Sequence, residues 1–352
     1  MTQVSLPAPR NFLPAPGQAT MPPATTRGAA TGMLDRYGRR ITNLRISVTD
    51  RCNFRCMYCM PAHARFRPAA DNLTYDEILR MVRLALRLGF TDFRVTGGEP
   101  LVRPGVLGFL EDLVRTEGVR RVAITTNGHL LGQHLDDLGR IGVRSINLSV
   151  DSLRADRFVR MARGGEPRRV WDAMERAAAD PRFHLKVNTV AMGGVNDDEI
   201  EDIAALTLDR DLDVRFIEYM PFGYWDAAPP GALVSAAEIE RRLRARFEVE
   251  PAAHADGDSG PAEYIRLKGA RGRVGFIQPV SDKFCRDCNR MRLTADGRLK
   301  ACLLIEEYRD VKTMLRGGGT DEELLALFGA ETFNKPEKHL GYRLFSMNET
   351  GG

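Results

Sequence analysis

The residues best suited to chemistry are six cysteines, which fall into two triplets. The first triplet is Cys52, Cys56 and Cys59, and the second is Cys285, Cys288 and Cys302. No cysteine is left over for core packing or for a disulfide. Each triplet offers three thiolates to a metal centre and leaves a fourth coordination position without an obvious cysteine. A metal site with an open position is typical of catalysis, whereas a site closed by four cysteines usually stabilises a fold.

The surroundings of the cysteines weigh against other uses. A lone C-x2-C pair is most often a zinc or redox site, and disulfides belong to oxidising compartments. His63 lies four residues after Cys59, so a zinc site of three cysteines and one histidine is conceivable at the first triplet. Tyr58 directly precedes Cys59. Soft thiolates in an apolar, aromatic setting suit an iron–sulfur cluster at least as well as zinc.

The pattern C-x3-C-x-aromatic-C at the first triplet resembles the cluster loop of the radical S-adenosylmethionine superfamily. Gly97-Gly98-Glu99-Pro100 resembles the glycine-rich stretch that receives the methionine amino group in that superfamily. The resemblance implies that the three cysteines hold three irons of a 4Fe–4S cluster. It also implies that the amino and carboxylate groups of S-adenosylmethionine chelate the fourth iron.

Composition and charge restrict the class of protein. The chain has 352 residues, a formal net charge of +4 and 28% charged residues, a balance that does not require a nucleic-acid partner. No apolar run approaches the roughly 20 residues needed to cross a bilayer, so we expect no membrane association. Together with cysteines that suit a reducing compartment, these features predict a cytoplasmic protein.

Residues 1–33 differ in composition from the rest of the chain. They are rich in Pro, Ala, Thr and Gly, contain no acidic residue and lack the apolar core of a secretory signal. The missing acids leave an organellar transit peptide open, but such peptides are rich in arginine, and only Arg10 and Arg27 are found here. We therefore expect a disordered extension.

From about residue 40, short β-rich runs alternate with amphipathic helical runs. We predict strands at 42–48, 92–96, 121–126, 143–149, 184–190 and 213–218. Thr74 and Glu77 predict a capping box before apolar residues at helical spacing, and Ser235 with Glu238 predicts the same start for a later helix. Six strand–helix units in this order imply parallel strands joined by right-handed crossovers.

Polar or glycine-rich residues follow every predicted strand. In chain order they are the first cysteine triplet, Gly97-Gly98-Glu99, Thr125-Thr126-Asn127-Gly128, Ser149-Val150-Asp151-Ser152, Asn188 and Glu218-Tyr219-Met220-Pro221. An open sheet would concentrate such residues at one switch point, whereas a barrel mouth collects them from all strands. We therefore predict an α/β fold, a partial six-unit TIM-like (β/α) barrel.

The pattern changes after about residue 250. Residues 251–261 form a loop rich in Pro, Ala, Gly and Asp, and residues 262–345 carry the second triplet in short strands and loops. Such a segment cannot bury a full core alone, so we expect it to cover the open side of the barrel. The predicted organisation is an extension at 1–33, the partial barrel at 34–250, and a C-terminal segment at 251–352 with a second 4Fe–4S cluster and a Gly-Gly tail.

The second triplet narrows the resemblance to the GTP 3′,8-cyclase family, also called molybdenum cofactor biosynthesis protein A. The match covers roughly residues 34–352. It rests on both cysteine motifs and on Arg94-Val95-Thr96-Gly97-Gly98-Glu99-Pro100, Thr125-Thr126-Asn127-Gly128, Ser149-Val150-Asp151-Ser152, Lys186-Val187-Asn188, Glu218-Tyr219-Met220-Pro221, Arg290-Met291-Arg292 and the terminal Gly351-Gly352.

The family's reaction is the first step of molybdenum cofactor biosynthesis. The resemblance implies that S-adenosylmethionine is cleaved to a 5′-deoxyadenosyl radical, which takes the C3′ hydrogen of the GTP ribose. The C3′ radical then attacks C8 of guanine, and the product is (8S)-3′,8-cyclo-7,8-dihydroguanosine 5′-triphosphate. No G-x4-G-K-[ST] phosphate loop is present, so GTP is not expected to bind in the manner of a GTPase.

The resemblance also implies roles for particular residues. Tyr58, Gly98, Ser149 and Met220 are expected to contact S-adenosylmethionine. Arg290, Arg292, Gly351 and Gly352 are expected to act in catalysis, with the free iron of the second cluster as the anchor of the guanine. The residues expected to bind GTP are Arg45, Arg94, Thr125, Lys186, Arg290, Met291 and Arg292. Arginine forks match phosphate oxygens, which supports the cationic members of this group.

The implied partners are GTP, an electron donor such as flavodoxin or ferredoxin, and a cyclic pyranopterin monophosphate synthase that consumes the product. A homodimer is a further expectation. Two other functions are kept open: a radical enzyme that modifies peptides and carries an auxiliary cluster, and a zinc-stabilised binding module. The peptide-modifying enzymes usually carry more auxiliary cysteines than the three found here.

Overall fold

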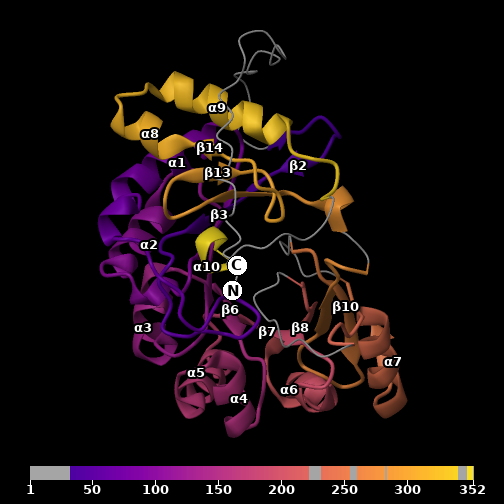
Figure 1. The fold of residues 1–352 in the computed structure, drawn as a ribbon. Coiled ribbons are helices and arrows are strands. Elements are labelled where there is room, and N and C mark those ends of the chain that lie inside the picture. Colours follow the sequence, from indigo (N-terminus) through magenta and orange to yellow (C-terminus); the bar gives the residue numbers. More distant parts are fainter. Residues whose placement is uncertain (1–31, 222–230, 254–259, 282–283, 340–346, 352) are drawn as a thin grey trace, which may run out of the picture.

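A single curved sheet forms the centre of the computed structural model, which describes residues 32–221, 231–253, 260–281, 284–339 and 347–351. The sheet has twelve strands in the order β14-β13-β12-β3-β4-β5-β6-β7-β8-β11-β10-β9 (Figure 1). All neighbours from β12 to β11 in this order are parallel, and the ribbons beyond them are antiparallel. A separate short ribbon pairs β1 (Met33–Leu34) with β2 (Arg40–Ile41).

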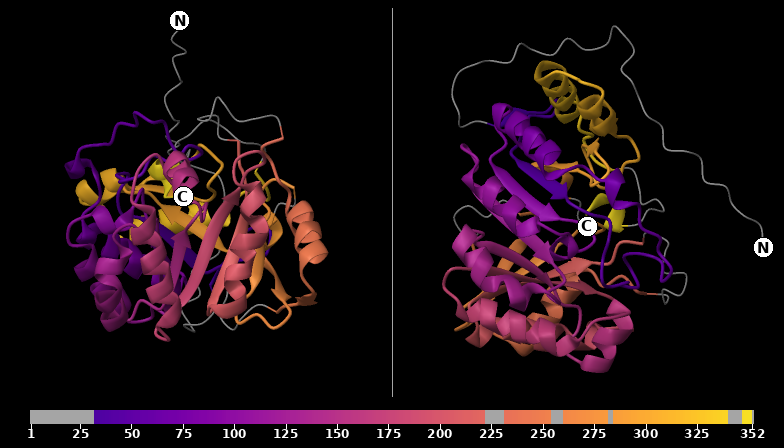
Figure 2. Two further views of the ribbon diagram at one scale, coloured as in Figure 1. Left: turned by 90° about the horizontal axis from the view of Figure 1, so that it is seen from below. Right: turned by 90° about the vertical axis from the view of Figure 1, so that its left-hand side faces the viewer.

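The six predicted strands are confirmed, with small differences at their ends. They are β3 (Asn43–Ser47), β4 (Asp92–Thr96), β5 (Arg121–Thr126), β6 (Ser145–Ser149), β7 (His184–Ala191) and β8 (Leu212–Glu218). The helices that join them are α1 (Tyr75–Arg87), α2 (Val106–Arg115), α3 (Leu131–Ile141), α4 (Ala155–Ala162), α5 (Pro167–Ala179) and α6 (Ile200–Asp209), followed by α7 (Ala236–Arg246). These helices lie around the outer side of the sheet (Figures 1 and 2).

The two predicted helix starts differ in detail. At α1, the Thr74 hydroxyl accepts from the Glu77 amide, and the Glu77 carboxylate accepts from the Thr74 amide, so the capping box is complete. At α7, the Ser235 hydroxyl accepts from the Glu238 amide at 3.3 Å, but the Glu238 carboxylate pairs with Arg241. Only half of the second box forms, because an arginine three residues further along competes for the carboxylate.

The C-terminal segment extends the sheet at both edges, which the sequence prediction did not foresee. Strand β11 (Val274–Ile277) pairs in parallel with β8, and β12 (Arg290–Leu293) pairs in parallel with β3. Antiparallel ribbons continue outward through β10 (Glu263–Leu267) and β9 (Val249–Pro251) on one side, and through β13 (Arg298–Lys300) and β14 (Arg309–Asp310) on the other. Within the described residues the strands do not close into a full barrel, in agreement with the predicted partial barrel.

Two further helices of the C-terminal segment cover one end of the molecule. They are α8 (Val311–Arg316) and α9 (Asp321–Phe333), which lie beyond β13 and β14 at the top of Figure 1. Phe328 of α9 packs against Phe90, which follows α1, with 5.1 Å between ring centroids. Both phenylalanines are fully buried, so the C-terminal segment shares one hydrophobic core with the barrel. None of the described helices combines the length and the apolar character required to span a membrane.

A buried ion pair joins β8 to the start of β11. The Asp213 carboxylate accepts from Arg273 Nε at 3.0 Å and lies 3.0 Å from His184 Nε2. Arg273 in turn stacks over the Tyr264 ring of β10 at 4.2 Å. Burial alone would raise the pKa of Asp213, but the hydrogen bonds from His184 and Arg273 outweigh it and lower that pKa to about 2. The pair therefore fastens the C-terminal segment to the last strand of the barrel.

We predict that Asp213→Asn lowers the free energy of unfolding by about 3 kcal/mol at pH 7, because the buried Arg273 loses the hydrogen-bonded carboxylate of this ion pair. The stabilising effect is present above the unfolded carboxyl pKa of about 3.9. It is lost as the pH falls through the folded value of about 2. Urea unfolding between pH 7 and pH 2 measures both. Asp209→Asn, which removes an exposed partner of Arg210, is the control and should change stability little. Equal stability of the two variants would contradict the prediction.

Candidate active site

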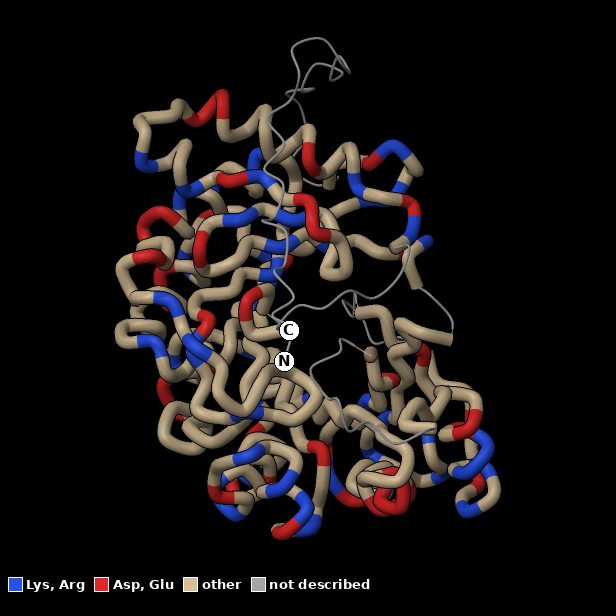
Figure 3. Tube along the Cα trace, viewed as in Figure 1, with Lys and Arg blue, Asp and Glu red and all other residues tan. Residues whose placement is uncertain are grey.

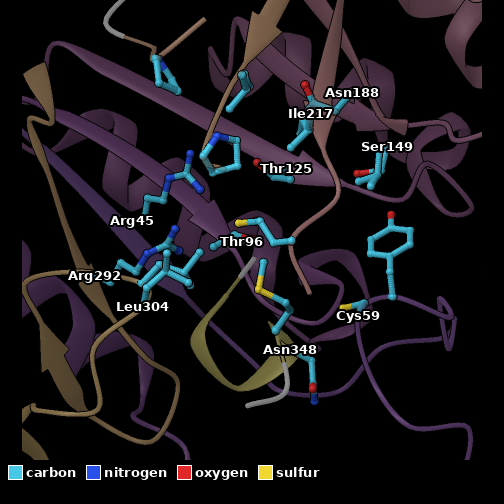
Figure 4. Close-up of a pocket in the computed structure, with 18 of the residues that line it drawn as sticks. Arg45, Cys59, Thr96, Thr125, Ser149, Asn188, Ile217, Arg292, Leu304 and Asn348 are labelled. Carbon is cyan, nitrogen blue, oxygen red and sulfur yellow. The ribbon is translucent and has the colours of Figure 1, made fainter. Parts of the chain in front are cut away.

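The carboxyl ends of the parallel strands open into one cavity of about 300 Å³ (Figure 4). All six cysteines line it, although the two triplets are more than 220 residues apart in the chain. Strand β3 carries the first triplet in the loop after its carboxyl end, and β12 and β13 carry the second triplet at their ends. Because β12 runs parallel to β3, the second triplet lies toward the amino end of these two strands and the first triplet follows the carboxyl end of β3, so the triplets face the cavity from opposite ends.

The first triplet lies in a loop that is held mainly by main-chain hydrogen bonds. The Cys59 amide donates to the Cys56 carbonyl at 2.9 Å, which forms a tight turn between the two thiols. Outside the loop, the end of α4 accepts from the amides of Arg55 and Met57 at 2.9 Å each. Asn127, after β5, approaches the Cys52 sulfur at 3.7 Å. The loop is therefore fastened to the third and fourth strand–helix units of the barrel.

The second triplet lies on two segments that flank a β-ribbon. Cys285 belongs to a short 3-10 turn at Phe284–Asp287, and the Cys288 amide donates to its carbonyl at 3.3 Å. Cys302 follows the ribbon strand β13 by two residues. Arg290 stacks over the Phe284 ring at 4.7 Å, and one of its N–H groups lies 3.8 Å from the Cys288 sulfur.

The thiols of neither triplet converge on a single point in the part of the chain that the structure describes. All six cysteines are unpaired and half-buried. Among the described residues, no three His, Cys, Asp or Glu side chains converge closely enough to hold one metal ion. In a 4Fe–4S cluster each cysteine binds a different iron, so its thiols need not converge on a point. His63 is exposed, and a zinc site of three cysteines and His63 is not formed.

The thiols of the two triplets differ in acidity. Burial is the main cause that raises the pKa of Cys52 to about 11 and that of Cys59 to about 12, with added repulsion from neighbouring anions. At Cys288, burial acts in the same direction, but the cations Arg290 and Lys335 outweigh it and lower the pKa to about 6. The first triplet must therefore lose its protons to a metal centre, whereas Cys288 already favours the thiolate.

The residues expected to contact S-adenosylmethionine come together in the structure. Tyr58, Gly98, Ser149 and Met220 all line the cavity, near the first triplet. Gly98 lies in a place that no side chain could occupy, because an added Cβ would be 2.4 Å from the Arg51 carbonyl oxygen. Its own amide donates to the Thr49 carbonyl at 2.7 Å, so the glycine-rich stretch packs directly on the loop of the first triplet.

Two buried carboxylates near the first triplet were quoted in the motifs but given no role by the sequence. Tyr58 donates to Asp151 at 2.7 Å, and burial raises the pKa of Asp151 to about 6. Glu99 accepts from the Thr126 hydroxyl at 2.8 Å and from the Asn127 amide at 2.7 Å, and burial raises its pKa to about 7. Both carboxylates orient residues of the cavity wall, which is a task that motif spacing alone does not reveal.

Three arginines expected to bind GTP form a row across adjacent strands. Arg292 of β12 is the Cα partner of Arg45 in β3, and Arg45 is the partner of Arg94 in β4. Side chains of such partners point to the same face of a sheet, and all three line the cavity. Figure 4 shows Arg45 and Arg292. Burial, followed by the charge of Arg292, lowers the pKa of Arg45 well below its usual range. A buried row of this kind is suited to a polyanion.

A fourth cavity arginine, Arg215 in β8, was missed by the sequence prediction. It is 1% exposed, donates to Asn188 Oδ1 at 2.9 Å and also bonds Asn147. An arginine between the apolar residues Val214 and Phe216 of a predicted buried strand was the signal that could have revealed it. Its charge also lowers the pKa of Arg45, after the effects of burial and of the nearer arginines.

The other residues expected to bind GTP differ in whether their side chains face the cavity. Thr125 and Arg290 line the cavity. Lys186 is buried, and it lies two residues before the cavity residue Asn188 on β7, so it faces the same side one step deeper. The Met291 side chain belongs to the hydrophobic core, on the opposite face from its neighbours. Because its side chain faces the core, Met291 could contact GTP only through its main-chain N–H and carbonyl groups.

The end of the chain enters the site. The short helix α10 (Met347–Thr350) lies beside the first triplet, where the Met347 amide donates to the Cys59 carbonyl at 3.1 Å. Asn348, which the sequence prediction missed, donates to the Asp50 carbonyl at 2.9 Å. The Gly351 carbonyl accepts from Arg292 at 2.7 Å, and Gly352 lies outside the described residues. A Cβ on Gly351 would be 2.8 Å from Ser47 Cβ, so the tail passes through a gap that only glycine fits.

Comparisons with known protein families agree with both halves of this site. The Radical SAM superfamily model matches residues 46–207, which carry the first triplet and its glycine-rich stretch. The model described as Molybdenum Cofactor Synthesis C matches residues 212–341, which carry the second triplet.

Individual relatives and structures point the same way. The chain is 42% identical over 333 residues to the GTP 3′,8-cyclase of Geobacter sulfurreducens, covering 91% of this chain and 99% of that relative. It is 41% identical over 312 residues to the GTP 3′,8-cyclase of Peptoclostridium acidaminophilum, covering 87% and 93%. The crystal structure of Streptococcus suis SuiB bound to S-adenosylmethionine shares the fold, with a TM-score of 0.58 at 17% identity over 83% of this chain and 68% of that one. The chain belongs to the GTP 3′,8-cyclase family of radical S-adenosylmethionine enzymes.

Proposed function

We propose that this chain converts GTP to (8S)-3′,8-cyclo-7,8-dihydroguanosine 5′-triphosphate in the cavity between its two cysteine triplets. The family membership gives the reaction, the use of S-adenosylmethionine and a 4Fe–4S cluster, and the place in molybdenum cofactor biosynthesis. The observation that carries the assignment of residues is the row of Arg292, Arg45 and Arg94, which faces the same cavity as both triplets. When bound, the first cluster and S-adenosylmethionine supply the radical that removes the ribose hydrogen.

The first triplet and its neighbours would hold these cofactors. We assign Cys52, Cys56 and Cys59 to the cluster and the surrounding wall to S-adenosylmethionine. Gly98 lets the glycine-rich stretch pack against the Arg51 main chain beside the first triplet, and the Tyr58–Asp151 hydrogen bond gives the adjacent wall a defined orientation. Ser149 and Met220 complete that wall, with a hydroxyl from β6 and a flexible apolar side chain after β8.

The arginine row would neutralise the triphosphate. Arg45, Arg94 and Arg292 each present a guanidinium fork, and Lys186 adds a point charge from the deeper layer. The negative charge of a bound triphosphate would offset the repulsion among these cations, so GTP would both fill and stabilise the site. Thr125 and Arg215 lie on the same inner face of the sheet and would orient the nucleoside.

We further propose that Cys285, Cys288 and Cys302 hold a second 4Fe–4S cluster with one free iron position for the guanine. The support is a triplet of free thiols on the cavity wall, one of which is already acidified by Arg290 and Lys335 against the effect of burial. Arg290 lies between this triplet and the arginine row. It can therefore contact the nucleotide while it stays beside the Cys288 sulfur.

The Gly351-Gly352 tail would order the site for ring closure. Gly351 occupies one N–H donor of Arg292, and helix α10 contacts the loop of the first triplet. The tail thus lies between the place where the radical forms and the place where the triphosphate binds. It excludes water there without adding side chains that a radical could attack.

The proposed setting follows from the chemistry of the site. Six unpaired cysteines favour the cytoplasm. An electron donor such as flavodoxin or ferredoxin would reduce the first cluster, and a cyclic pyranopterin monophosphate synthase would consume the product. A homodimer is proposed with these partners.

The first test concerns Cys56. We expect Cys56→Ala to abolish the formation of 5′-deoxyadenosine, because one iron of the first cluster loses its ligand. The second triplet is untouched, so its cluster should persist in the variant. Product analysis together with electron paramagnetic resonance measures both effects. Normal cleavage of S-adenosylmethionine by the variant would refute the assignment of the first triplet.

The second test concerns Arg292. We expect Arg292→Ala to retain iron and fold but to weaken GTP binding about 10- to 100-fold, which corresponds to the loss of a charge-assisted hydrogen bond of about 1.5–3 kcal/mol. Calorimetry with GTP measures the affinity. Arg266→Ala, which removes an exposed arginine from another strand, is the matched control and should bind GTP normally. An unchanged affinity in Arg292→Ala would contradict the role of the row.

The third test removes Gly351 and Gly352. Iron content and GTP binding should stay near normal, and cleavage of S-adenosylmethionine should continue at least in part. The cyclised product should disappear, because the tail no longer orders Arg292 and the neighbouring wall. Chromatography of the products distinguishes cleavage from cyclisation. Full formation of the cyclic product by the truncated chain would show that the tail has no part in the reaction.

A further inference from the structure

Two buried cations that belong to none of the motifs of the site contact the main chain around the second triplet. Lys335 follows α9 and is 2% exposed, and Arg39 lies in the turn between β1 and β2 and is 8% exposed. Neither was selected from the sequence, because both lie far along the chain from the cysteines. Cations are rarely buried to this extent unless their N–H groups are fully used.

Lys335 joins the two segments that carry the second triplet. Its Nζ donates to the Arg290 carbonyl at 2.9 Å and also to the Ala301 carbonyl. Arg290 lies two residues after Cys288, and Ala301 directly precedes Cys302. One ammonium group therefore sets the spacing between the main chains at two of the three cysteines.

Arg39 holds the third cysteine and also the segment that contains Lys335. One of its terminal nitrogens donates to the Cys285 carbonyl at 2.7 Å and to the Glu337 carbonyl at 3.0 Å. The other donates to the carbonyls of Lys335 and Pro336, at 3.3 and 2.7 Å. Asp35 accepts from Nε at 2.6 Å and is itself buried, so every part of the guanidinium is engaged.

The contacts of the two cations form a continuous chain from the β1–β2 turn to all three cysteines of the second triplet. Each contact is to a main-chain carbonyl at a cysteine or within two residues of one, or to the segment 335–337 that carries the second cation. Carbonyl contacts fix the path of the main chain and leave the thiols free to bind metal. Partners that orient metal ligands in this way typically affect metal affinity 10- to 100-fold.

We propose that Lys335 and Arg39 are positioning residues that hold the three thiols of the second triplet in the geometry that its cluster requires. The proposal rests on the proposed second cluster and adds the residues that preorganise it. Lys335 also lines the cavity, so its positive charge lies near the proposed cluster and the polyanionic substrate. The Lys335 ammonium group therefore joins the two cysteine segments and adds to the positive electrostatic potential of the cavity.

The test compares Lys335→Met, Lys335→Arg and Lys312→Met in the full chain. We expect Lys335→Met to fold and to assemble the first cluster, but to lower the occupancy of the second cluster about tenfold or more. Lys335→Arg should restore most of it, because a guanidinium can donate to both carbonyls. Lys312 also donates to a main-chain carbonyl, that of Asp71 at 3.0 Å, but this hydrogen bond is exposed and its acceptor does not belong to a cysteine segment, so Lys312→Met should assemble both clusters.

Two readouts are independent of turnover. Iron content and electron paramagnetic resonance count each cluster, with Cys56→Ala and Cys288→Ala as references for the two signals. Reconstitution of the protein without iron by ferrous iron and sulfide, in a Cys56→Ala background, reports through the thiolate-to-iron absorption how readily the second triplet takes up its cluster. In that titration Lys335→Met should assemble the second cluster about tenfold or more weakly than the same chain with Lys335.

A second variant keeps the proposal testable if Lys335→Met does not fold. Arg39→Lys retains a charge beside Asp35 but cannot reach the Cys285 and Pro336 carbonyls together, so it should lower the occupancy of the second cluster selectively. Equal loss of both clusters in the two variants, or full occupancy of the second cluster with an unchanged signal in Lys335→Met, would overturn the proposal. An unaltered chain that assembles one cluster only would instead overturn the proposed function of the second triplet.

Discussion

The repulsion among buried arginines at one edge of a parallel sheet is the constraint on which the rest of the site depends. Arg292, Arg45 and Arg94 occupy neighbouring strands in register, and adjacent strands are only about 4.8 Å apart. Burial and the neighbouring charges lower the pKa of Arg45 well below its usual range. Such a row is tolerated only where acceptors and anions surround it. The surrounding elements supply these: a chain end, a set of thiols and a cavity for a polyanion.

The C-terminal tail supplies one acceptor to the arginine row and also contacts the loop of the first triplet. Its Gly351 carbonyl accepts from Arg292, and its helix α10 donates to the carbonyl of Cys59 in the loop of the first triplet. The same few residues therefore contact the arginine row and the loop of the first triplet. A short set of hydrogen bonds therefore connects Arg292, through the tail, to the loop of the first triplet.

The C-terminal segment depends equally on buried charged groups that reach across the molecule. Glu218, at the end of β8, accepts from the amides of Val280 and Ser281 at 3.0 and 2.9 Å, which fixes the chain that leads to Cys285. Asp213 and Arg273 fasten β11 to β8, and Arg39 and Lys335 hold the second triplet from the opposite side. The segment has short strands and few local contacts, so these charged groups provide the specificity that a large core of its own would provide elsewhere.

The sequence alone determined the order of the strands, the cysteine motifs and the family. Period-two runs such as 92–96 and 121–126 became β4 and β5 with the same ends, because local patterning specifies a buried parallel strand. The sequence also indicated the arginines that lie in or near these motifs, which are Arg45, Arg94, Arg290 and Arg292. It did not indicate Arg215 and Asn348, whose roles depend on partners far along the chain. The spacing of local motifs carries no information about such partners.

Only the tertiary structure decided how the C-terminal segment meets the barrel. β11 and β12 add to opposite edges of the sheet, which brings the second triplet to the wall of the cavity that the first triplet also lines and places the Met291 side chain in the core. Which edge a short strand joins depends on hydrogen bonds and packing between residues hundreds of positions apart. The positioning contacts of Arg39 and Lys335 are of the same kind, because a buried cation is defined by the carbonyls around it, and the fold alone brings those carbonyls together.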